Sequence, residues 1–155
     1  MSMRLNLAKI EDALLASVRA DPAALIGAVF LDDGRARQGF SREADMFVDD
    51  YRTLIAVAEG RAEAEHGTVR WKKCYPWLAT ATGESGENDV AGSVLGYGPA
   101  FVLDPAGVTA VAQGLVGEGW GVGKVGTGRF EGFEALVPFY VEAARQGRAI
   151  VGGVS

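Results

Sequence analysis

The chain has 155 residues and contains one imidazole, at His66, and one thiol, at Cys74. Nucleophilic catalysis needs a nucleophile, a base and a group that orients the base. These two side chains would supply the first two groups if the fold brought either of them beside the carboxylates between Glu84 and Asp89. An enzyme that acts on a small molecule through His66 or Cys74 is therefore one hypothesis for the function.

The local sequence favours simpler roles for both residues. His66 lies between Glu65 and Gly67 at the expected end of a helix, where the helix dipole stabilises a solvated cation. Cys74 lies in an aromatic segment, and a free cysteine is more often buried and unreactive than nucleophilic. We therefore assign no catalytic residue from the sequence.

The segment from Gly117 to Gly128 is half glycine, and Gly121, Gly123 and Gly126 formally match G-x-G-x-x-G. That fingerprint binds a pyrophosphate when it follows a strand and opens a helix. Here the preceding residues have a helical pattern, and too little chain follows for the second half of a dinucleotide fold. The segment is more typical of a flexible surface connection, with nucleotide binding as the alternative.

Metal binding would have to rely on carboxylates, since one thiol cannot build a cysteine-based site. The candidate acidic groups are Asp32-Asp33, Asp49-Asp50, and the set of Glu84, Glu87 and Asp89. None of them follows the spacing of a calcium-binding loop. The sequence predicts no metal site and no cofactor.

Aromatic residues form the remaining candidate site, at Trp71, Tyr75, Trp77 and Tyr97. Contacts within the core are the simpler explanation for them. The alternative is that some of them line a groove or a partner surface, where Trp and Tyr contribute a large share of binding energy. These four residues are our candidate ligand- or partner-binding residues.

Charge and hydropathy exclude several function classes. The formal net charge is −5, whereas a protein that binds nucleic acid needs a basic face to neutralise phosphates. The longest apolar run, Ala23 to Leu31, is shorter than a membrane span. The N-terminus turns polar too early for a signal peptide. We therefore expect a cytoplasmic protein with no nucleic-acid or membrane partner.

Apolar periodicity indicates the elements that must position these side chains. Met3, Leu5 and Leu7 alternate with polar residues and predict a strand with one buried face. Two Asp-Pro pairs, at 21–22 and 104–105, are typical helix starts because Asp caps the free N–H groups. We expect helices over about 10–20, 23–31, 45–60, 71–79, 105–116 and 130–146, with Pro76 kinking or delaying the fourth. Further strands are expected within 97–103 and 149–151, and loops over 32–41 and 80–92.

Helices dominate this pattern, and the strands are few and short. The sequence therefore predicts an α+β fold, mostly helical with a small sheet, in one domain over residues 1–155.

The order of the elements also carries a family resemblance. An N-terminal strand and helix precede an Asp-Pro helix; later come Gly96-Tyr97-Gly98-Pro99-Ala100 and then Leu103-Asp104-Pro105. The chain ends with Phe139 to Ala144, Gly147 and an apolar strand. Together these features resemble the YfbM-like family of small bacterial proteins, a domain of unknown function. The resemblance covers nearly the whole chain and implies a single α+β domain without an assigned reaction.

One departure from that family concerns imidazoles. Its members carry a Trp-His pair and a second His on the helix before a Thr-Gly turn. When that helix is aligned on Trp71 and the turn on Thr82-Gly83, this chain has Lys72 and Tyr75 at the two His positions. The resemblance therefore implies no imidazole chemistry at these positions.

The leading hypothesis from the sequence is a non-catalytic cytoplasmic module that binds a protein partner or a small ligand. Partner binding of the immunity or antitoxin kind is one version, by analogy with other small acidic bacterial proteins. The enzyme that uses His66 or Cys74 with nearby carboxylates is the alternative, and nucleotide binding at Gly117 to Gly128 is a third.

Overall fold

The computed structural model describes residues 3–23, 46–48, 51–62, 68–93, 96–120 and 131–155. A four-stranded sheet lies at the centre, with the order β2-β1-β4-β3 and antiparallel pairing throughout. Its strands are β2 (Met46–Val48), β1 (Leu5–Ile10), β4 (Ala149–Val154) and β3 (Phe101–Leu103). β1 and β4, which lie near the two ends of the chain, thus pair with each other along their whole length.

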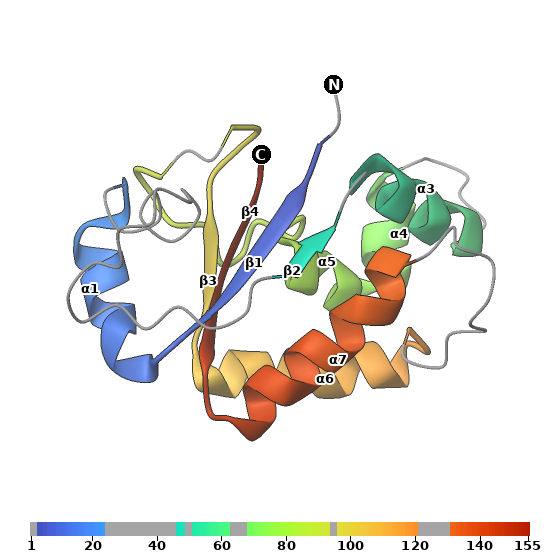
Figure 1. Cartoon of the computed structure of the whole chain (residues 1–155). Helices are drawn as coiled ribbons and strands as arrows, with labels where there is room; N and C mark the ends of the chain where they lie inside the picture. The colour runs from blue at the N-terminus through green and yellow to red at the C-terminus, as the bar shows by residue number, and fades with distance from the viewer. Residues whose placement is uncertain (1–2, 24–45, 49–50, 63–67, 94–95, 121–130) are drawn as a thin grey trace.

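Helices cover both faces of this sheet (Figure 1). A 3-10 turn (Asp12–Leu14) and α1 (Leu15–Ala20) lie on one side. The larger helical layer on the other side contains α3 (Tyr51–Arg61), α4 (Thr68–Cys74), α5 (Pro76–Thr82), α6 (Pro105–Gly117) and α7 (Glu131–Arg145). The predicted α+β class, mostly helical with a small sheet, is confirmed.

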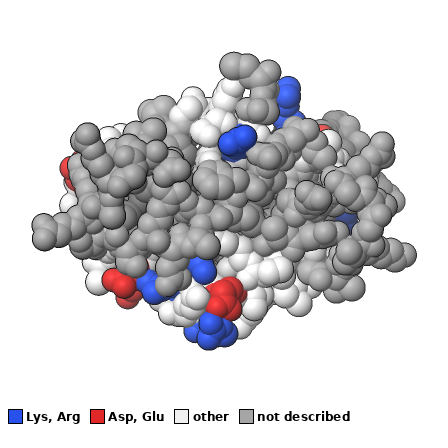
Figure 2. Space-filling view, viewed as in Figure 1, with Lys and Arg blue, Asp and Glu red and all other residues white. Residues whose placement is uncertain are grey.

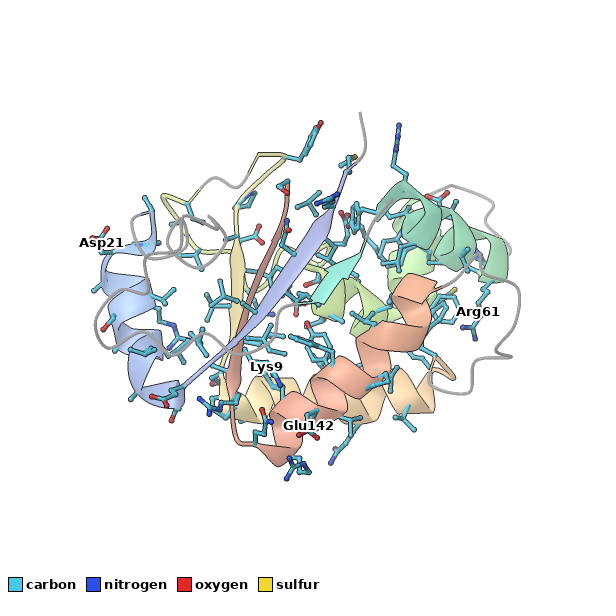
Figure 3. The ribbon with its side chains drawn as sticks, in the orientation of Figure 1. Lys9, Asp21, Arg61 and Glu142 are labelled. Atoms are coloured by element: carbon cyan, nitrogen blue, oxygen red, sulfur yellow. The ribbon has the colours of Figure 1, made fainter. Side chains whose placement is uncertain are left out.

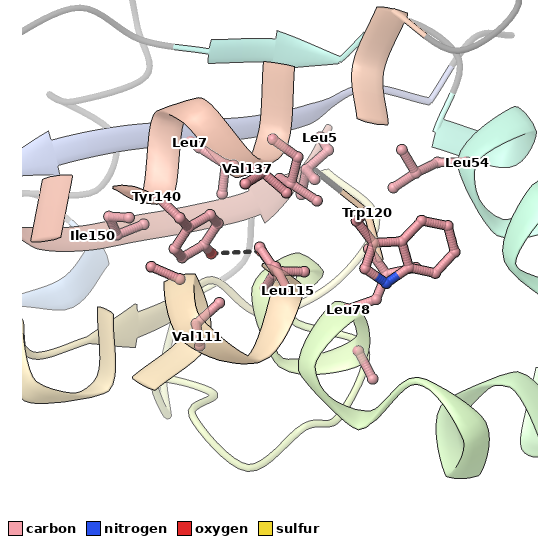
Figure 4. Packing of buried hydrophobic residues seen from close by; sticks show 14 of the residues in the cluster. Leu5, Leu7, Leu54, Leu78, Val111, Leu115, Trp120, Val137, Tyr140 and Ile150 are labelled. Carbon is pink, nitrogen blue, oxygen red and sulfur yellow. Dashed lines mark hydrogen bonds between the residues drawn. The ribbon is translucent and has the colours of Figure 1, made fainter. Parts of the chain in front are cut away.

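The main hydrophobic core lies between the sheet and the larger helical layer (Figure 4). It contains Leu5, Leu7 and Ile150 from the sheet, and Leu115 and Tyr140 from α6 and α7. Burial raises the pKa of the Tyr140 hydroxyl above its ordinary value. That hydroxyl donates a hydrogen bond of 2.6 Å to the Ala81 carbonyl, which ties α7 to α5. A smaller cluster under α1 covers the opposite face of the sheet.

The prediction that the first strand has one buried face was wrong. All six residues of β1 are buried, because this strand is central and both faces of the sheet are covered. Asn6 donates from Nδ2 to the Ser155 hydroxyl at 2.8 Å. The Lys9 ammonium points toward α7 (Figure 3) and donates to Gln146 Oε1 at 3.1 Å. Asn6, one of the two polar residues that suggested a solvent face, is thus buried with a hydrogen-bond partner, whereas the other, Arg4, is exposed and precedes β1.

Three predicted helix boundaries also change. The helix expected over 45–60 begins only at Tyr51 and extends to Arg61, because Met46–Val48 pair with β1 as a strand. The helix expected over 10–20 starts later, since Ile10 belongs to β1. Pro76 does not bend one helix over 71–79 but begins a second one, α5, which continues to Thr82.

Other local predictions agree with the structure. Asp104 caps α6, and its Oδ1 accepts the Gly107 N–H at 2.7 Å. Pro138 lies inside α7, and Gly147 follows that helix with a φ of 65°, a conformation that favours glycine. The predictions for 24–45, including the apolar helix and the loop at 32–41, lie outside the described residues. No helix in the described part of the chain is long and apolar enough to cross a membrane.

Candidate ligand-binding groove

The four aromatic candidates occupy different environments. Trp71 is 1% exposed and belongs to the main core, whereas Trp77 and Tyr97 are 38% and 46% exposed. Tyr75 is half-buried and meets the Trp120 ring edge-on, with the ring centroids 5.0 Å apart. The structure therefore divides the predicted set, and Trp71 has no surface to offer a ligand.

The difference between Trp71 and Trp77 follows from the corner at Pro76. Proline cannot donate a backbone hydrogen bond and is favoured in the first turn of a helix. Tyr75 therefore leaves the helical conformation, with φ −129° and ψ 65°, and α5 starts in a new direction. This turn lets Trp77 lie on the outside of the helical layer.

Trp77 rests directly against α6. A Cβ atom added at Gly114 would lie 2.0 Å from Trp77 Cγ, well inside contact distance. The indole thus packs on the bare backbone of α6, while more than a third of the residue stays exposed. Only glycine at position 114 permits this approach.

A groove of about 500 Å³ opens beside this indole. Its lining includes Lys72, Lys73, Trp77, Thr80, Ser85 and Glu87, and we call it the Trp77 groove. The volume falls within the range of about 300–1,000 Å³ that is typical of small-molecule sites. The lining combines an aromatic ring, two hydroxyls and charges of both signs.

The charges at the Trp77 groove differ in whether they are paired. Lys72 Nζ lies 3.1 Å from Glu84 Oε2, and the Tyr51 hydroxyl donates to the other oxygen of Glu84. Burial, followed by the hydrogen bond to Glu84, raises the pKa of Tyr51 above its ordinary value. Lys73 and Glu87, by contrast, form no ion pair with any residue that the structure describes.

The turn at Gly83 brings Glu84 to this position. Gly83 ends α5 with a φ of 80°, and a Cβ atom there would lie 2.4 Å from the ring of Phe101. Glycine is therefore required both by the left-handed conformation and by the close approach of Phe101. The chain then turns so that Glu84 meets Tyr51 from α3 and Lys72 from α4.

Glu84 also lines a second, smaller pocket of about 100 Å³, together with Asp89, Tyr97 and Phe101. Desolvation, and then the negative charge of Glu84, raise the pKa of Asp89. This pocket is smaller than the usual range of small-molecule sites, and Tyr97 lies here rather than at the Trp77 groove.

Glu118 holds the N-terminus of α5 in place. Its Oε2 accepts the Trp77 N–H at 3.0 Å, and its Oε1 accepts the Leu78 N–H at 3.0 Å and the Trp120 indole N–H at 3.1 Å. The residue that precedes α5, Tyr75, provides no side-chain cap of its own. A carboxylate from the end of α6 therefore satisfies the free N–H groups of α5 and sets the position of Trp77.

Arg61, at the end of α3 (Figure 3), contacts the residues around the start of α5. Its guanidinium lies 3.8 Å from the Trp120 ring centroid and 5.2 Å from that of Tyr75. Arg61 Nη2 donates to the Glu118 carbonyl at 3.2 Å, and the Tyr75 hydroxyl donates to the Arg61 carbonyl at 3.0 Å. Tyr75 thus makes its contacts within the protein. Of the four aromatic candidates, Trp77 is the one that lines the groove.

Paired charges are also found on the face viewed in Figure 1. Figure 2 shows basic and acidic side chains next to each other at its lower edge, over the end of α7, where Arg145 and Glu142 form an ion pair. The hydrogen bond from Arg145 lowers the pKa of Glu142. Lys73 and Glu87 differ from this pair because neither has a partner within the described part of the chain.

The reactive side chains proposed from the sequence do not form a site among the described residues. Cys74 is exposed, so the expectation that it is buried was wrong. It is not among the described residues that line either pocket. No three His, Cys, Asp or Glu side chains gather as metal ligands within the ranges the structure describes. His66, the acidic pairs at 32–33 and 49–50, and Gly121 to Gly126 lie outside those ranges.

No family model, curated protein or solved structure matches this chain. The resemblance to the YfbM-like family therefore stays a prediction.

Sequence reasoning missed Lys73, Ser85, Glu87 and Glu118 as residues of this site. The pair Lys72-Lys73 beside Trp71, Tyr75 and Trp77 was a usable signal, because basic and aromatic residues are adjacent there. Pro76 was a second signal, since it separates the faces of the two tryptophans. Nothing in the sequence indicated that Glu118 caps a helix that begins 42 positions earlier, at Pro76.

Proposed function

We propose that this protein is a non-catalytic binding module, and that its ligand site is the Trp77 groove. The observation that carries this proposal is an exposed indole on a groove of small-molecule size, beside a lysine and a glutamate that have no partner among the described residues. Large aromatic side chains contribute much of the binding energy at ligand and partner sites, and charges without a partner can orient a ligand beside them.

The way Trp77 is held supports the same proposal. Its backbone N–H is fixed by Glu118, and its ring packs on Gly114. A side chain that is already in place loses little conformational entropy when a ligand binds. Such preorganisation is typical of binding sites, most of which are largely formed before the ligand arrives.

The volume of the groove favours a small molecule over a protein partner. A stable protein interface buries about 800 Å² on each side, whereas the Trp77 groove is a local hollow. The net charge of −5 argues against nucleic acid, and we place the module in the cytoplasm as part of this proposal. The enzyme hypothesis gains no support here, because neither Cys74 nor an imidazole is among the described residues of the groove.

A fragment screen by nuclear magnetic resonance tests the proposal, because it needs no candidate ligand at the outset. The three tryptophans give three indole N–H signals, which Trp77→Phe and Trp120→Phe variants assign. We expect hits that shift the Trp77 signal and leave the buried Trp71 signal in place. Hits that map only to other regions, or a full library without a hit on Trp77, would contradict the proposal.

A further inference from the structure

We infer that the ligand of the Trp77 groove is a small zwitterion with a planar ring, in the chemical class of the aromatic amino acids. This inference rests on the proposed function and adds the chemistry that the groove selects. Its basis is the combination, in the same hollow, of one aromatic surface with one positive and one negative charge that have no ion-pair partner among the described residues.

The ring requirement comes from Trp77. Trp77 is 38% exposed although its ring packs closely against α6, and the residue lines the groove, so it offers an aromatic surface to a ligand. A planar ring covers such a surface best, and aromatic pairs contribute about 0.5–1.5 kcal/mol beyond the burial of their area. A ligand without a ring would cover less of this surface.

The charge requirement comes from Lys73 and Glu87. Lys72 also lines the groove, but it is occupied by Glu84, whose second oxygen accepts from Tyr51. Lys73 and Glu87 therefore supply the two groove charges that have no partner in the described ranges of the chain. A ligand with only a negative charge would be attracted by Lys73 but repelled by Glu87. A ligand with only a positive charge would be attracted by Glu87 but repelled by Lys73. A ligand that carries both charges is the one that both residues attract.

The two hydroxyls of the groove fit the same ligand. Thr80 donates its proton to the Pro76 carbonyl at 3.0 Å, so the lone pairs of its hydroxyl oxygen are available to a ligand ammonium group. The Ser85 hydroxyl oxygen lies 3.4 Å from the Glu87 backbone N–H, which leaves its own proton available to a ligand carboxylate. One hydroxyl is thus free to accept and the other to donate.

Three probes of similar shape separate the charges: L-phenylalanine, 3-phenylpropanoate and 2-phenylethylamine. Their dissociation constants are measured on the full chain from the Trp77 indole N–H signal at low ionic strength. Because exposed charge pairs contribute modestly, we expect L-phenylalanine to bind about two- to fivefold more tightly than either singly charged probe. Added salt should reduce this preference, because it screens both contacts.

Matched variants assign each charge to its residue. Lys73→Met should abolish the preference for L-phenylalanine over the amine, while Lys73→Arg should keep it. Glu87→Gln should abolish the preference over the carboxylate, while Glu87→Asp should keep it. Because Lys73 and Glu87 are exposed, none of these changes should alter the fold.

The outcomes distinguish a failure of the zwitterion inference from a failure of the Trp77 groove as a ligand site. Equal affinity for the three probes at Trp77, or tightest binding of a singly charged probe, overturns the zwitterion inference and leaves the groove as the ligand site. If no probe shifts the Trp77 signal, the inference also falls, and the fragment screen alone then decides whether the groove binds any ligand.

Discussion

Trp71 and Trp77 are six positions apart and belong to adjoining helices, yet one is buried and the other is exposed. Trp71 is almost fully buried in the main core, whereas Trp77 packs against α6 and also lines the groove. The corner at Pro76 causes this difference, because it redirects the chain between the two residues. An aromatic-rich segment can thus contribute to the core and to a surface site at once.

The charged residues of the groove also differ from one another. Lys72 pairs with Glu84, which accepts a hydrogen bond from the Tyr51 hydroxyl. Lys73 and Glu87, by contrast, have no partner among the described residues. The charge of Lys72 is thus neutralised within the protein, while the charges of Lys73 and Glu87 are available to a ligand.

Truncation of the two tryptophans should give the largest difference between the core and the groove in the free energy of unfolding. Trp71→Ala should lower the free energy of unfolding by about 3–5 kcal/mol, because it leaves a cavity in the core. Trp77→Ala should lower it by only about 1–2 kcal/mol, since the residue is partly exposed. Urea denaturation of both variants measures these values. Equal losses would show that Trp77 is a core residue as well.

Removal of the Glu118 cap should have the next largest effect. Glu118→Ala leaves the N–H groups of Trp77, Leu78 and Trp120 without their acceptor, and we expect a loss of about 1–3 kcal/mol. The Trp77 indole signal should also move, because the start of α5 is released. Asp104→Ala removes the cap of α6 and is the control, since it should cost about 1 kcal/mol and leave the Trp77 signal in place. An unchanged Trp77 signal in Glu118→Ala would contradict the positioning role of Glu118.

Two glycine-to-alanine substitutions test whether Trp77 packs against the backbone of α6. Gly60→Ala, in α3, meets no atom within 4 Å and should stabilise the protein by about 0.5–1 kcal/mol. Gly114→Ala gains the same helix propensity, but its Cβ would overlap the Trp77 ring, so we expect no gain or a net loss of about 1 kcal/mol. Thermal unfolding of both variants provides the measurement. Equal stabilisation by the two changes would mean that Trp77 does not rest on α6.

Asp89→Asn should have the smallest effect, and its sign depends on pH. The raised pKa means that the folded protein binds the Asp89 proton more tightly than the unfolded chain does. Stability from this group is therefore present below the ordinary range of an aspartate and is lost as the pH rises. Because Asp89 is exposed, we expect the variant to gain only about 0.5 kcal/mol or less at about pH 7, and nothing at about pH 3. A loss of stability at neutral pH would contradict this assignment.

Local patterns predicted the parts of the fold that depend on neighbours in the sequence. The Asp104 cap and the apolar stripe of α7 depend on nothing in the rest of the chain. The short strand Met46–Val48 was missed, because its pairing with β1 comes from residues more than 30 positions away. The buried faces of β1 were missed for the same reason, since Asn6 and Lys9 find their partners near the C-terminus.

The candidate site was predicted only through Trp77. Its residue type marked it as a binding candidate, but the same reasoning selected Trp71, and only the turn at Pro76 separates the two. Lys73, Ser85 and Glu87 are ordinary surface residue types, and their convergence depends on how α4, α5 and the following turn pack together. Such convergence is a property of the tertiary structure, which periodicity and propensity do not contain.

A crystal structure of the protein with the strongest fragment hit bound tests the central claim most directly. The account predicts electron density for the ligand ring against Trp77, within contact distance of Lys73 or Glu87. Ligand density in the smaller pocket beside Asp89, or anywhere else, with the surface of Trp77 left uncovered, would contradict it.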